Sequence, residues 1–147
     1  MIKLYEESAQ LGHVKAQLRM AFFFETGTIL EKDAKSCFEW YKKAAENGEV
    51  KAQFSVAMCY YKGQGCKKDE EAAVEWFRKA ADAGFERALY NLGYCYEHGN
   101  GVERSVDTAL YFYAAAVDKG NAQAQKRLDA YGLTLEQVKS KFKEMPQ

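Results

Sequence analysis

Apolar residues recur along this chain at the spacing of amphipathic helices. Ala88, Leu92 and Tyr96 illustrate the pattern, because positions three or four residues apart share one face of a helix. Gly99 and Gly101 follow this stretch and indicate a turn that ends the helix. A second amphipathic stretch comes next, and the whole unit then repeats every 36 residues. The pattern therefore predicts two helices in each period.

The two helices of a period form two alternating sets along the chain. The first helices, named A helices, are expected at about 14–26, 50–62, 86–98 and 122–131. The second helices, named B helices, are expected at about 2–11, 34–47, 70–83 and 106–119. Thr134 and Gln137 are spaced as in a capping box and predict a closing helix.

A gapless period of this length is typical of a solenoid, in which each repeat packs on its neighbours. Trp40 and Trp76 occupy one column of the repeat, and Phe112 continues it. We expect one all-α array divided as follows: a partial repeat with a B helix only at 2–12, full repeats at 13–48, 49–84 and 85–120, a partial repeat at 121–132, and a capping helix at 134–145. The start at a B helix leaves open that the chain is a fragment of a longer array.

Composition narrows the class of protein. Hydrophobic residues make up 48% of the chain and aromatic residues 14%, which is typical of a well-packed protein. Basic and acidic residues number 21 each, so the zero net charge gives no support to nucleic-acid binding. No stretch approaches the length of an apolar membrane span.

The four cysteines are expected to be free thiols. Cys59 and Cys95 occupy the same column of successive repeats, so their helices should lie about 8–10 Å apart. This spacing exceeds the usual Cα separation of a disulfide. Free thiols and the absence of an apolar leader favour a cytoplasmic location, with a removed signal peptide left open.

The sequence contains no convincing catalytic or metal-binding motif. Cys95 and His98 could share a helix face, but a metal site or a nucleophile needs further partners, and the chain has two histidines. Gly63 and Gly65 recur one period later as Gly99 and Gly101, which identifies them as turns between helices and not as phosphate loops. We therefore assign no catalytic, cofactor-binding or metal-binding residue and expect a protein that is not an enzyme.

The repeats resemble those of the Sel-1-like repeat family, a 36-residue relative of tetratricopeptide repeats. The third repeat carries the resemblance in Ala88, Leu92, Gly93, Tyr96, Gly99, Gly101, Val102, Ala109, Phe112, Tyr113, Ala115, Ala116 and Gly120. The resemblance implies a right-handed α/α superhelix whose members act as adaptors and scaffolds, without shared catalytic residues. A cysteine-rich branch of the family has been linked to β-lactam binding, but Ala45 and Ala52 stand where its cysteine pair is expected. Binding or hydrolysis of such a small molecule is the alternative function.

The resemblance also implies a place for a partner, because the A helices of tetratricopeptide arrays line the concave surface. Carrying that geometry over by position predicts a groove lined by Lys15, Leu18, Phe22, Lys51, Phe54, Met58, Arg87, Tyr90, Asn91, Tyr94 and His98. Such a surface suits a protein or peptide partner with large apolar side chains and an acidic group. The other interpretation is that the aromatic residues belong to the core between repeats and the cations form an ordinary solvated stripe.

Overall fold

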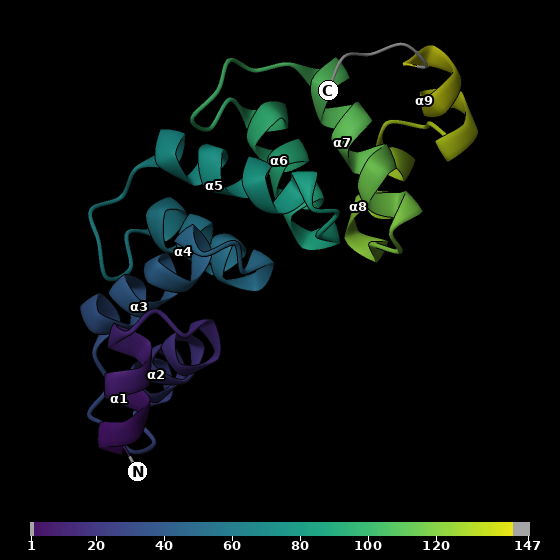
Figure 1. The fold of residues 1–147 in the computed structure, drawn as a ribbon. Coiled ribbons are helices and arrows are strands. Elements are labelled where there is room, and N and C mark those ends of the chain that lie inside the picture. Colours follow the sequence, from purple (N-terminus) through teal and green to yellow (C-terminus); the bar gives the residue numbers. More distant parts are fainter. Residues whose placement is uncertain (1, 143–147) are drawn as a thin grey trace. The chain divides into compact units, whose positions relative to one another are not determined.

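The computed structural model describes residues 2–142, and most of them are helical. The A helices are α2 (Val14–Thr26), α4 (Val50–Lys62), α6 (Glu86–His98) and α8 (Ala122–Ala130). The B helices are α1 (Ile2–Gln10), α3 (Ala34–Glu46), α5 (Glu70–Asp82) and α7 (Val106–Asp118), and α9 (Leu135–Lys141) closes the chain (Figure 1). Each A and B helix begins and ends within one residue of its predicted bounds. Residues 143–145 of the predicted capping helix lie outside the described residues.

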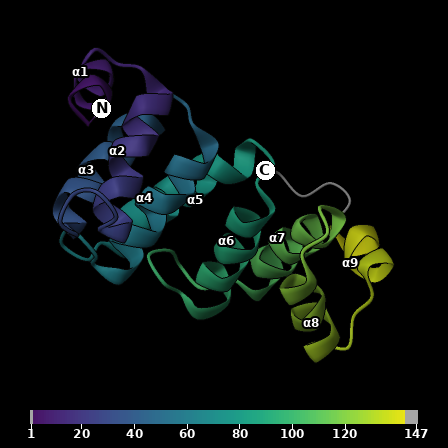
Figure 2. The same ribbon diagram turned by 90° about the horizontal axis from the view of Figure 1, so that it is seen from below.

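The chain divides into two compact units, Met1–Trp76 (unit 1) and Phe77–Gln147 (unit 2), and the boundary falls within α5. In unit 1, α1 packs on α2, α2 on α3, and α3 on α4. In unit 2, α7 packs on α6, α8 and α9 (Figures 1 and 2). Each unit therefore contains its own helix-on-helix packing, and the surfaces of the two units are described separately below.

Local signals in the sequence fix the helix ends. The Asp33 side chain accepts hydrogen bonds from the backbone nitrogens of Lys35 and Ser36 at 3.1 and 3.3 Å, which satisfies two free donors of α3. At the other end of the chain, the expected capping box joins Thr134 and Gln137 in both directions. These contacts explain why the sequence alone locates the helices so closely.

The turn after α4 contains Gly63 and Gly65, and it requires glycine at the second of these positions. Gly65 has φ +75°, and a Cβ atom there would lie 2.2 Å from the backbone oxygen of Ala34. In the first repeat Ile29 takes this place, and no residue other than glycine has a positive φ within residues 2–142. The turn of the first repeat consequently has another backbone course and leaves Ile29 48% exposed.

Buried alanines and aromatic rings form the core of each unit. In unit 1, one cluster contains Phe38, Val56 and small residues of α3 and α4, and a second contains Met20 and Phe23 between α1 and α2. In unit 2, Leu92, Tyr113 and Leu128 are fully buried. Small residues let the helix backbones approach, and the larger side chains fill the remaining space.

Candidate partner-binding surfaces

The structure leaves most of the predicted groove residues accessible, and it does so in both units. The exposed residues are Lys15, Phe22 and Lys51 in unit 1 and Arg87, Tyr94 and His98 in unit 2. The half-buried residues are Leu18 and Met58 in unit 1 and Tyr90 and Asn91 in unit 2.

Phe54 differs from this prediction. It is only 8% exposed, so its ring belongs to the core and offers a partner almost no surface. The position of Phe54 in the repeat could not reveal its burial, because burial depends on which neighbouring helices cover the ring. We therefore remove Phe54 from the accessible residues.

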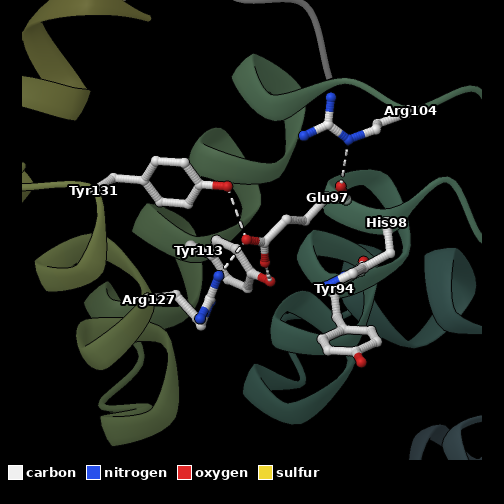
Figure 3. Close-up of polar contacts among 7 residues, drawn as sticks. All are labelled: Tyr94, Glu97, His98, Arg104, Tyr113, Arg127 and Tyr131. Atoms are coloured by element: carbon white, nitrogen blue, oxygen red, sulfur yellow. Dashed lines mark hydrogen bonds and ion pairs between the residues drawn. The ribbon is translucent and has the colours of Figure 1, made fainter.

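Tyr94 and His98 form a pair of rings on the surface of α6, tilted by 30° to each other (Figure 3). They stand four residues apart on one helix face, their ring centroids lie 4.2 Å apart, and His98 Nδ1 lies 3.1 Å from the backbone oxygen of Tyr94. Tyr94 remains 38% exposed. One turn earlier, the Tyr90 ring packs against buried Tyr113 at a centroid distance of 5.6 Å. The α6 surface thus joins an exposed aromatic pair to the core of unit 2.

Glu97 precedes His98 in the sequence, but its side chain points toward α7 and α8 and is only 6% exposed (Figure 3). Its carboxylate accepts hydrogen bonds from the hydroxyl groups of Tyr113 at 2.6 Å and Tyr131 at 2.8 Å, and it forms an ion pair with Arg127 (Figure 3). Arg104 donates from Nε to the backbone oxygen of Glu97 at 2.9 Å. We call the carboxylate and its three side-chain donors the Glu97 cluster. It fastens the end of α6 to α7 and α8.

The electrostatics of the Glu97 cluster keep each member in one protonation state. Burial alone would raise the pKa of Glu97, but the hydrogen bonds from Arg127, Tyr113 and Tyr131 outweigh it and lower the pKa. Burial, followed by the bond to Glu97, raises the pKa of Tyr113. The carboxylate therefore stays charged and the tyrosine hydroxyl stays a donor near neutral pH.

The structure also brings several unit 1 residues together around one cavity between α1 and α2. Three residues of the predicted groove, Lys15, Leu18 and Phe22, line it, and Tyr5 and Arg19 line it as well. Its volume is about 710 Å³.

Sequence reasoning missed the roles of Arg127 and Tyr131, which lie 30 and 34 residues after Glu97. A repeating signal for part of the cluster exists in the sequence. The Tyr41 hydroxyl donates to Glu25 at 2.7 Å, and this pair has the same 16-residue separation as Glu97 and Tyr113. A glutamate at the end of an A helix with a tyrosine in the following B helix is therefore a recurring contact in the first and third repeats.

Other kinds of site find no support in the described part of the chain. Within residues 2–142, no group of three or more His, Cys, Asp or Glu side chains is placed to hold a metal ion. No helix in that range has the length and apolar character needed to span a membrane. The four cysteines are free thiols; Cys37 and Cys95 are buried, whereas Cys59 and Cys66 are half-buried.

Comparisons with known proteins place the chain in a family. The Sel1 repeat model matches residues 2–13, 14–49, 50–85 and 86–121. A Sel1 repeat protein from Oxalobacter formigenes is 36% identical over 86% of this chain and 95% of its own, with a TM-score of 0.77. No significant match was found among curated proteins.

Two further solved structures share the fold. The protective antigen c5321 of uropathogenic Escherichia coli, which displays an SLR fold, is 29% identical over 100% of this chain, with a TM-score of 0.83. The matching region is 34% of that antigen. Cysteine rich protein B of Helicobacter pylori is 23% identical over 87% of this chain and 97% of its own, with a TM-score of 0.66, and it shows the similarity of fold alone.

These matches agree with the predicted fold class, an all-α solenoid of helix–turn–helix repeats. Proteins built from such repeats are generally non-enzymatic scaffolds that bind other proteins. From the four matched repeats and the 36% identical relative, we conclude that this chain belongs to the Sel1 repeat family.

Proposed function

We propose that this protein is a non-catalytic scaffold module that binds a protein or peptide partner through the outward-facing side chains of its A helices. The observation that carries the proposal is the exposure of a large ring at one repeat position in both units. Phe22 is 43% exposed and Tyr94 is 38% exposed, and the two residues stand two periods apart in one column of the repeat. Covering such rings removes apolar surface from water and favours association.

The contacts among the side chains of α6 support this function. The Tyr94 and His98 rings pack against each other, and Glu97 on the same helix is held by side chains of α7 and α8. A partner that docks on this surface would therefore order few side chains, and little conformational entropy would be lost on binding. Tyrosine and arginine are also enriched among the residues that dominate interface energies, and Arg87 is exposed on the same helix.

The charges of the A helices indicate the chemistry of the partner. Lys15 and Lys51 in unit 1 and Arg87 in unit 2 occupy one column of the repeat, and all three are exposed. A partner segment with large apolar side chains and acidic groups complements rings and cations of this kind. We propose this class of partner for the protein.

A paired affinity purification from native lysate tests the proposal. The test variant carries Tyr94→Ala and His98→Ala, which remove this pair of rings but leave the Glu97 cluster in place. The control variant carries Asp82→Ala and Glu103→Ala, two exposed acidic residues of unit 2. We expect a partner that the wild type and the control both retain and the test variant loses. Equal recovery by all three proteins, or no specific partner, would contradict the proposal.

A further inference from the structure

The cavity between α1 and α2 combines apolar walls with two cations. Lys15 stands three and four residues before Leu18 and Arg19, and these stand four and three residues before Phe22, so the four residues share one face of α2. Tyr5 contributes a ring from α1. The cavity volume of about 710 Å³ is large enough for one or two side chains of a bound segment.

Both cations are available to a ligand. Lys15 and Arg19 are exposed, and neither forms an ion pair with any residue in the range 2–142. Among residues 2–142, no acidic side chain lines the cavity. The cavity therefore has a local positive charge that the protein itself does not neutralise, although the chain as a whole has no net charge.

The pair of cations is particular to α2. Lys51 in α4 and Arg87 in α6 repeat the position of Lys15, but Ser55 and Asn91 take the position of Arg19 in these helices. Arg127 in α8 stands at that position too, but it is paired with Glu97. The arrangement is thus not a regular stripe along the repeats, which weakens the interpretation of these cations as an ordinary solvated face.

We propose that this cavity binds an acidic side chain and a neighbouring large apolar side chain of the same partner segment. The carboxylate would pair with Lys15 and Arg19, and the apolar side chain would pack against Leu18, Phe22 and the Tyr5 ring. An arginine–carboxylate pair supplies direction, and the apolar contact supplies most of the buried surface. This inference rests on the proposed scaffold function and specifies the chemistry of one contact.

Selection from a phage-displayed library of random dodecapeptides, with the wild-type protein as bait, tests the inference. We expect enriched peptides to carry Asp or Glu within a few residues of a large apolar residue. Lys15→Gln with Arg19→Gln should weaken the binding of a selected synthetic peptide by about tenfold or more, because both cations that would pair with its carboxylate are removed. Lys51→Gln, the matched change at the same column one repeat later, should leave the affinity within about twofold, because Lys51 does not line the cavity.

The outcomes separate this inference from the proposed function. Enriched peptides without acidic residues, or peptides whose affinity the Lys15 and Arg19 changes leave intact, would overturn the cavity assignment. Enrichment of no peptide would overturn it as well. Self-association of the wild type that the double change abolishes would identify a second copy of the chain as the occupant, against the inference. In each of these cases, loss of a cellular partner from the Tyr94 and His98 variant would still support the scaffold function.

Discussion

Replacing Glu97 with glutamine tests whether the cluster at the end of α6 holds unit 2 together. Glu97→Gln preserves the shape of the side chain but removes its charge. The carboxylate accepts from Tyr113 and Tyr131 and pairs with Arg127, and it is 6% exposed. Glutamine has a single acceptor oxygen and an amide group that only donates. At least one of the three donors would therefore lose its acceptor.

The burial of these groups determines how much stability Glu97→Gln should remove. A hydrogen bond to a charged group contributes about 1.5–3 kcal/mol, and breaking a buried ion pair costs about 3–5 kcal/mol. Arg127 keeps 36% of its side chain exposed and can regain water, which reduces the second figure. We expect a loss of about 2–4 kcal/mol in the free energy of unfolding. The matched change Glu25→Gln should cost below about 1 kcal/mol, because Glu25 is exposed and bonds to Tyr41 alone among the contacts shown.

Urea unfolding followed by far-ultraviolet circular dichroism measures both losses at pH 7 and at lower pH. The pKa of Glu97 is lowered in the folded protein, so its stabilising contribution is present above the ordinary glutamate pKa of about 4.3. It is lost as the pH falls through the folded-state pKa. The difference between wild type and Glu97→Gln should therefore shrink below about pH 4.3. A loss at pH 7 no larger than that of Glu25→Gln would refute this account of the cluster.

Two further substitutions and one labelling experiment have defined outcomes. Gly93→Ala would place a Cβ atom 2.7 Å from the buried Tyr113 ring, so overpacking of about 1–3 kcal/mol should exceed the gain of about 1 kcal/mol in helix propensity. The melting temperature should fall, and a rise would contradict the packing argument. Burial raises the pKa of the Cys37 thiol to about 12, so iodoacetamide at pH 8 should modify it more slowly than half-buried Cys66. Mass spectrometry of the labelled protein measures the two rates, and equal rates would speak against the burial of Cys37. Thr134→Ala removes the capping box and should destabilise α9 by about 0.5–2 kcal/mol, seen as faster amide exchange in that helix; unchanged exchange would count against the cap.

The helices could be predicted from the sequence because their signals are local and repeated. Gly27, Gly63 and Gly99 each end an A helix in the left-handed conformation, one period apart. The capping box of α9 is likewise readable within four residues. These signals do not depend on how distant parts of the chain pack, so the bounds of the A and B helices are reproduced within one residue.

The exposure of individual side chains could not be predicted in the same way. Leu18, Phe54 and Tyr90 share one column of the repeat, but Phe54 is buried and the other two are half-buried. The environment of Glu97 depends on Arg127 and Tyr131 in the next A helix and in the turn that follows it, which no pattern within a single repeat reveals. Tertiary packing decides such differences. The only signal in the sequence is the glutamate–tyrosine spacing of the first and third repeats, and it indicates only one contact of the Glu97 cluster.

Photo-crosslinking from the α6 surface addresses the proposed scaffold function at its point of contact. Benzoylphenylalanine would be placed at position 94 in one protein and, as a control, at position 82 on α5 in another. Both proteins would be irradiated in native lysate, and the crosslinked products identified by mass spectrometry. The proposal predicts a discrete protein adduct from position 94 that is absent from position 82. No adduct from position 94, or the same adducts from both positions, would contradict the proposal that a partner binds on this face.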